Sequence, residues 1–217
     1  MTLMPGRSAR PDTRGMRITR AGWALMTVLS TLIVLLSAKY AGLDPDDFLS
    51  EQRDTYLRHE LALGVHISGA IVALAVGPWQ FCARLRRRWP HWHRRIGVLY
   101  LLGCLVGGIG ALFLAPLAYG NAVSRLGFAC LGVAWLITGG IGLRMILRGR
   151  VEGHRRWMVR SFALTFAAVT LRLMLVAALA AGLDFRTCYL VIAWLCWVPN
   201  LLLACWFTRL RPVRQVS

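Results

Sequence analysis

Long apolar runs separated by short polar segments set the pattern of this chain. Six runs are about 20 residues long, the length that an α-helix needs to cross the hydrocarbon core of a bilayer. The pattern therefore predicts an all-α membrane protein, a bundle of six transmembrane helices. We place the helices at residues 21–39, 61–83, 96–119, 126–147, 161–183 and 187–208, between a basic tail at 1–20 and a second tail at 209–217.

Arginines are distributed unequally between the two ends of these predicted helices. The two tails and the second and fourth loops, with the helix ends beside them, carry 20 basic residues, whereas the three alternate segments carry five. An excess of arginine is typical of the cytoplasmic side of a membrane protein. We therefore expect both termini in the cytoplasm and the protein in the cytoplasmic membrane, with its arginines near anionic lipid head groups.

Composition agrees with this interpretation and excludes several classes of protein. The chain is 57% hydrophobic, which is more than a soluble domain of 217 residues can bury. Its net charge of +17 sits in the loops and helix ends, so we expect no nucleic-acid partner. The six cysteines never form a Cys-x-x-Cys pair and indicate no metal cluster. Motifs of soluble enzymes are absent from the sequence, which leaves open whether the protein is an enzyme.

His93 and His154 form one candidate site, because they lie at the cytoplasmic ends of two different predicted helices and at matching depth. Such a pair could ligate the iron of one b-type haem. These residues suggest no metal other than this haem iron. Arg94 and Arg155 follow the two histidines and could pair with the haem propionates. The alternative is an interfacial anchor that faces anionic lipid head groups.

Arg172 is a second candidate, because it lies near the middle of the fifth apolar run. A charge at that depth is costly and normally faces a partner or a polar cavity. The six runs offer no carboxylate, apart from Glu60 at the border of the second. Partners could be His66, Gln80 or Asn200, or an anionic or carbonyl-bearing ligand such as a quinone. A purely structural arginine is the alternative.

Several of these residues belong to motifs by which the chain resembles the bacterial membrane-protein family known as domain of unknown function 2306. The resemblance covers residues from about 60 to 208. It implies a helical membrane domain in which His66, His93, His154 and Arg172 are motif positions, and it implies no activity. The motifs are His66, Gly77-Pro78-x-Gln80-Phe81, His93-Arg94-x-x-Gly97-x-x-Tyr100, His154-Arg155-x-Trp157-Met158-x-Arg160-Ser161-x-Ala163 and Thr170-x-Arg172.

Three functions follow as hypotheses. The first is a membrane protein that binds a b-type haem or a quinone-like ligand for transmembrane electron transfer, at His93 and His154 or at a site with Arg172, His66, Gln80 and Asn200. The second is a transporter or a lipid- or anion-binding protein that holds its ligand with Arg172. The third is a membrane assembly subunit without catalytic activity, whose protein partners the sequence does not indicate.

Overall fold

The computed structural model describes residues 19–42, 48 and 50–209, and this part of the chain is helical without a β-strand. Most of both predicted tails lies outside the described residues. The elements are α1 (Arg20–Ala38), η1 (Lys39–Gly42), α2 (Ser50–Arg58), α3 (Glu60–Val76), η3 (Pro78–Phe81), α4 (Ala83–Arg88), α5 (Pro90–Leu114), η4 (Ala115–Leu117), α6 (Ala122–Leu147), α7 (Val151–Thr165), α8 (Ala167–Ala180), α9 (Phe185–Leu195) and α10 (Val198–Arg209).

Six segments of the described chain are long and apolar enough to cross a membrane, which confirms the predicted six-helix bundle. Large apolar side chains cover much of their outer surface; Phe113 and Leu147, for example, are 68% and 77% exposed. Lipid is the solvent that accommodates such a surface. The segments are Arg20–Ala38, Glu60–Phe81, Pro90–Leu117, Ala122–Leu147, Val151–Ala180 and Phe185–Arg209.

Two of the segments begin earlier than their apolar runs. The third starts at Pro90 and the fifth at Val151, so the two His-Arg-Arg motifs lie within the first turns of α5 and α7. Proline suits the first position of a helix, where no backbone N–H is needed. Arginine is a good helix former, and its long side chain can reach the membrane surface from inside a helix. Hydropathy alone therefore places the start of these helices too late.

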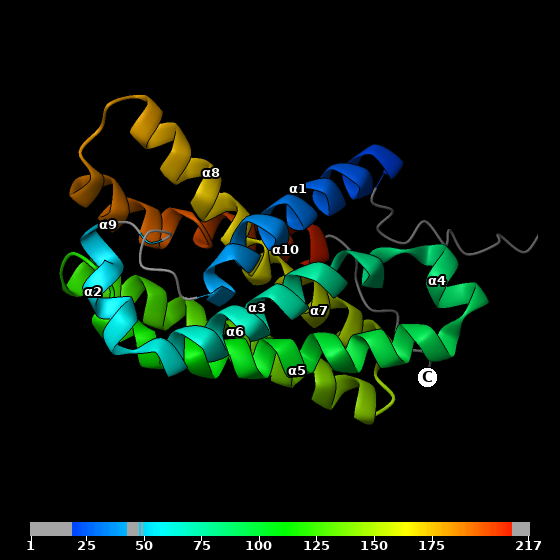
Figure 1. The fold of residues 1–217 in the computed structure, drawn as a ribbon. Helices are drawn as coiled ribbons and strands as arrows, with labels where there is room; N and C mark the ends of the chain where they lie inside the picture. Colours follow the sequence, from blue (N-terminus) through cyan, green and yellow to red (C-terminus); the bar gives the residue numbers. More distant parts are fainter. Residues whose placement is uncertain (1–18, 43–47, 49, 210–217) are drawn as a thin grey trace, which may run out of the picture.

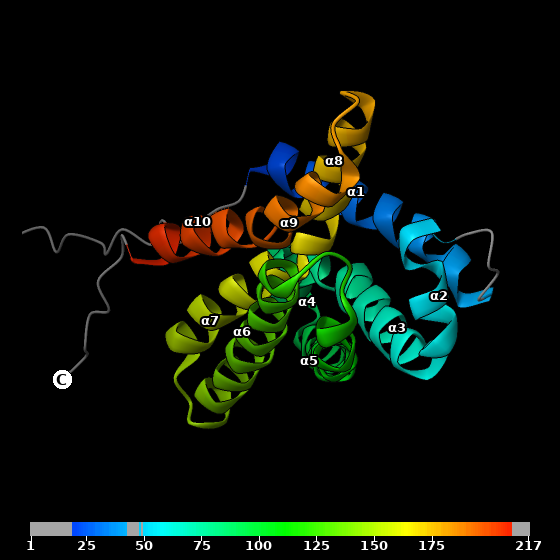
Figure 2. The same ribbon diagram turned by 90° about the vertical axis from the view of Figure 1, so that its left-hand side faces the viewer.

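The last two segments are each interrupted near the middle. The fifth breaks at Phe166, between α7 and α8, and the sixth breaks at Cys196 and Trp197, before Pro199. Proline lacks the N–H that would continue the ladder of hydrogen bonds, which accounts for the second break. Pro116, in contrast, lies in the 3-10 turn η4 that ends the third segment. In Figures 1 and 2, α8 projects away from the other helices beyond its break.

Glycines bring α3 and α5 together as the closest pair of helices. A Cβ atom on Gly69 of α3 would lie 2.2 Å from the backbone nitrogen of Gly107 on α5. A Cβ on Gly110 would lie 2.6 Å from the backbone nitrogen of His66. Small residues allow this close approach of backbones. Gly103, Gly107, Ala111 and Ala115 follow one another at a spacing of four residues, which places small side chains along one face of the third segment.

The two ends of the bundle differ in their charge. Figure 1 shows α2 at one end of the long α3–α5 pair and α4 at the other, and we call these the α2 end and the α4 end. The α4 end also holds the start of α7, because the charges of Arg86 and Arg155 interact there. The arginine-rich second and fourth loops thus meet at one end of the bundle, as alternating spans require.

Candidate functional site

A cavity of about 700 Å³ lies between α1, α3 and α8 and extends toward the α2 end. Its volume falls in the range of small-molecule sites, about 300–1,000 Å³. Much of its wall is apolar and comes from helices far apart in the sequence. The apolar lining includes Ile33, Leu63, Leu74, Phe128, Leu171 and Leu175.

Arg172 lines this cavity from α8. Its Nη2 donates a hydrogen bond to the Ser37 hydroxyl of α1 at 2.9 Å, and its Nη1 donates to the Ala168 carbonyl at 3.1 Å. Both acceptors are neutral, so no described carboxylate balances the guanidinium. A guanidinium carries five N–H donors, and two bonds leave donors for another acceptor in the cavity.

His66 lines the same cavity from α3, and its Nδ1 lies 2.9 Å from the Gly107 carbonyl oxygen of α5. A carbonyl only accepts hydrogen bonds, so Nδ1 carries the proton of the neutral ring and Nε2 is left as an acceptor. The Arg172 charge is near enough to act on His66. The structure thus brings together His66 and Arg172, two of the four residues predicted for a ligand site.

The short helix α2 closes the cavity at one end. Phe48 stacks on Tyr40 with ring centroids 5.5 Å apart and meets Tyr56 edge to face. The Tyr56 hydroxyl donates a hydrogen bond to the side-chain oxygen of Gln52, which is 8% exposed. Burial raises the pKa of Tyr56, so this phenol stays protonated as a donor.

A network of hydroxyl groups borders the cavity at Thr165 and Trp135, and sequence reasoning missed it. Thr165 Oγ1 accepts a hydrogen bond from Trp135 Nε1 at 2.9 Å and lies 2.9 Å from the Tyr100 hydroxyl. Tyr100 also bonds to the Ser161 hydroxyl at 3.0 Å, and Thr165 donates to the Ser161 carbonyl at 3.2 Å. Each polar atom of this network has a partner, so it holds α5, α6 and α7 together. Tyr100 and Ser161 are motif positions, which was the signal available in the sequence.

His93 and His154 lie at the α4 end, away from this cavity. The Nδ1 of His154 is 2.8 Å from the Gly142 carbonyl oxygen, an orientation that metal-ligating imidazoles often show. His93 Nδ1 is buried without a hydrogen-bond partner among the described residues, and the rings of His93 and His154 are near enough to interact electrostatically. Neither histidine lines the cavity with Arg172, nor the smaller cavity beside α2. A haem at this pair stays a prediction.

Gln80 also belongs to the α4 end. Its Oε1 would lie 3.3 Å from a Cβ atom on Gly97 of α5, and its buried Nε2 makes no hydrogen bond with a described residue. It does not line the cavity with Arg172. The glycine of the His93 motif therefore makes room for the glutamine of the preceding motif.

Asn200 makes hydrogen bonds around the two helix breaks. Its side-chain nitrogen lies within hydrogen-bond distance of Thr170 Oγ1, at 3.0 Å, and of the Cys196 and Ala163 carbonyls, at 3.0 and 3.4 Å. It links α10 to α7 and α8 and compensates for the interrupted backbone ladder. Like Gln80, it is not part of the cavity lining.

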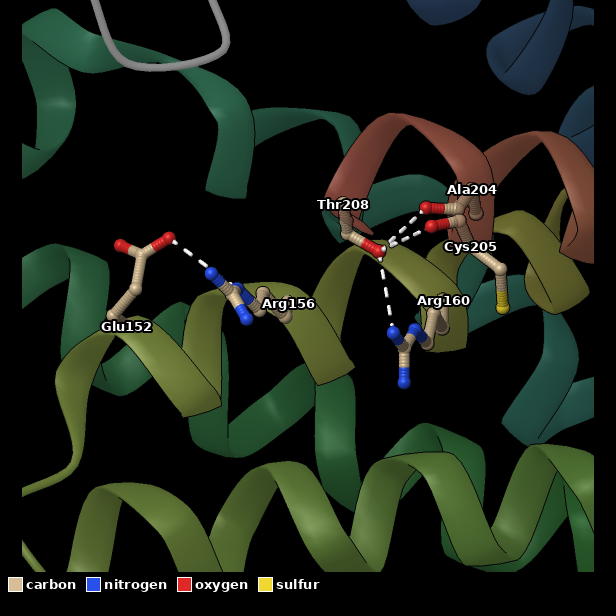
Figure 3. Close-up of polar contacts among 6 residues, drawn as sticks. All are labelled: Glu152, Arg156, Arg160, Ala204, Cys205 and Thr208. Atoms are coloured by element: carbon tan, nitrogen blue, oxygen red, sulfur yellow. Dashed lines mark hydrogen bonds and ion pairs between the residues drawn. The ribbon is translucent and has the colours of Figure 1, made fainter. Parts of the chain in front are cut away.

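Arginines cluster around the histidine pair at the α4 end. Burial, and then the charge of Arg155, lowers the pKa of Arg86. Figure 3 shows two further arginines of α7 in defined contacts. Arg156 lies 3.7 Å from Glu152, and Arg160 donates to the Thr208 hydroxyl of α10 at 3.3 Å. The α7 arginines therefore contribute to helix packing as well as to surface charge.

Comparison with known proteins identifies a family for this chain. A family model described as "Predicted membrane protein (DUF2306)" matches residues 63–208, and this confirms the resemblance carried by the motifs. Neither a curated protein nor a solved structure matches the chain. The matched segment contains His66, His93, His154 and Arg172, whereas α1 lies outside it. The chain belongs to this DUF2306 family of predicted membrane proteins.

Proposed function

We propose that this membrane protein binds a quinone-like amphiphile in the cavity between α3 and α8. The observation that carries the proposal is that Arg172 and His66 line one largely apolar cavity of about 700 Å³. The apolar walls suit the ring and tail of such a molecule, and Arg172 holds an oxygen atom of its head group. Concave sites of this kind use a few polar groups to orient a mostly apolar ligand.

The charge of Arg172 supports an oxygen acceptor in the ligand. Its hydrogen-bond partners are one hydroxyl and one carbonyl of the protein, and both are neutral. A charged group inside a membrane protein normally faces a polar partner or a ligand. A carbonyl or a carboxylate would serve the remaining donors, so a fatty acid is the alternative ligand and lipid or anion transport the alternative function.

The arginine clusters support an orientation for the site. We propose that the α4 end faces the cytoplasm of a bacterial inner membrane, because the arginine-rich loops meet there. The cavity then lies toward the opposite leaflet, and its ligand enters from the lipid or the outer surface.

Equilibrium binding to the purified full chain in mild detergent tests the proposal. The probes are decylubiquinone, palmitate and dodecane, which share an apolar chain and differ in their head groups. We expect decylubiquinone to bind and Arg172→Gln to weaken it about ten-fold or more, because a hydrogen bond to a charged group is lost. Arg148→Gln, at an exposed residue of the α6–α7 turn, is the matched control.

The three probes also separate the alternatives. Binding of palmitate without decylubiquinone would favour the lipid- or anion-binding function. Equal binding of dodecane and decylubiquinone, or equal affinity in Arg172→Gln and wild type, would contradict a role for the cavity arginine.

A further inference from the structure

His66 and Arg172 offer different hydrogen-bonding groups to the cavity. On the α3 side, His66 presents Nε2, because its Nδ1 is held by the Gly107 carbonyl at 2.9 Å. Gly110 of α5 packs against the His66 backbone, where a Cβ atom would lie 2.6 Å from the His66 nitrogen. In the neutral ring Nε2 is only an acceptor.

On the α8 side, the cavity has hydrogen-bond donors instead of an acceptor. Arg172 has donors only, and two of them are already used by Ser37 and Ala168. A second positive charge on His66 beside this guanidinium would be costly inside a membrane protein, which keeps the ring in its acceptor form.

Several other polar groups of the cavity wall are already paired. Thr165 is bonded to Trp135, Tyr100 and the Ser161 carbonyl, and Tyr56 donates to Gln52. His66 and Arg172 thus offer the cavity an acceptor on α3 and donors on α8. A complementary head group has one O–H donor and one oxygen acceptor.

We propose, resting on the function proposed above, that the cavity selects the reduced, dihydroxy form of its ligand: one hydroxyl of a quinol donates to His66 Nε2, and its other oxygen accepts from Arg172. An oxidised quinone has two acceptors and no donor. The second carbonyl oxygen of the quinone would face the lone pair on His66 Nε2. Both atoms are acceptors, so no hydrogen bond could form between them. An acceptor left without a donor in a buried site weakens binding by about ten-fold or more.

Equilibrium binding of three matched ligands to the purified wild-type chain tests this selectivity. They are decylubiquinone, its quinol kept reduced under anaerobic conditions, and the dimethyl ether of that quinol. The ether keeps the two oxygen atoms of the quinol hydroxyl groups and lacks their hydrogen atoms. We expect the quinol to bind about ten-fold more tightly than the other two. Comparison of the quinol with its ether tests the role of the O–H groups on the wild-type chain, without a protein variant.

His66→Phe gives the matched test on the protein, since it keeps a flat ring and removes the nitrogen atoms. In this variant, checked for folding by thermal unfolding, quinol and quinone should bind with similar affinity. Equal or tighter binding of the quinone by the wild type, or binding of the ether as tight as that of the quinol, would overturn the selectivity and leave the proposed function intact. Absence of binding by all three would overturn both.

Discussion

Arg172 donates a hydrogen bond of 2.9 Å to Ser37, a residue of α1 that lies outside the family-matched segment. The half-buried cation of the fifth span is thus held by the first span, although 135 positions separate the two residues. Because Ser37 is neutral, this contact fixes the guanidinium without neutralising it. Arg172 therefore keeps its charge for the cavity that it lines.

Replacing Ser37 by Ala tests this contact. We expect Ser37→Ala to lower the free energy of unfolding by about 1.5–3 kcal/mol, because a hydrogen bond to a charged group is lost. Ser30→Ala is the control on the same helix, since the Ser30 hydroxyl is buried at 1% exposure and makes no hydrogen bond within the part of the chain that the structure describes. Removing that unpaired hydroxyl should be neutral or stabilising. Equal losses in the two variants, measured by denaturation in detergent, would contradict the role of Ser37.

The glycine contact between α3 and α5 predicts a large effect from a single methyl group. In Gly69→Ala the new Cβ would lie 2.2 Å from the Gly107 nitrogen, so the helices must separate. We expect a loss of about 1–3 kcal/mol in the free energy of unfolding, or more. Gly64→Ala on the same helix is the control, because its Cβ meets nothing within 4 Å. A Gly69→Ala protein as stable as the control would show that the helices do not pack this closely.

The orientation of the bundle can be measured with single cysteines in a chain whose native cysteines are replaced. Arg87→Cys in α4 should react with a membrane-impermeant maleimide only after the cells are opened. Arg53→Cys in α2 should react in intact cells, because α2 lies at the opposite end of the bundle (Figure 1). The opposite labelling pattern would reverse the predicted topology.

The haem prediction for His93 and His154 has its own spectroscopic test. Protein purified in mild detergent, after expression with added haem, should show a Soret band that His93→Ala and His154→Ala both abolish. His59→Ala, at a histidine near α2, should leave the band unchanged. A protein without a Soret band would remove the haem hypothesis and leave the proposal for the Arg172 cavity unaffected.

The sequence predicted the fold from its composition and from the position of each residue along a transmembrane helix. Counting residues along a helix separated His66 from the His93 and His154 pair, and the structure places them in this way. The same reasoning marked Arg172 as a buried charge that needs a partner. These deductions depend on position along one helix, which a single sequence shows directly.

The rest depends on how helices pack against one another. Nothing near Ser37 in the sequence indicates that it meets Arg172, and Asn200 and Gln80 looked like equally good partners. The structure uses Asn200 at the helix breaks and places Gln80 at the α4 end. The pairing of Tyr100 with Thr165 likewise joins α5 to α7 across the core. Such contacts require the arrangement of the helices, which hydropathy does not specify.

Lipophilic molecules that copurify with the protein give the most direct test of the proposed ligand site. The wild-type chain and Arg172→Gln are purified in parallel from native membranes in mild detergent, extracted with organic solvent and analysed for quinones by mass spectrometry. We expect a quinone in near-stoichiometric amount with the wild type and its loss from Arg172→Gln. Equal amounts in both proteins, or none in either, would contradict the binding of a quinone-like ligand by Arg172.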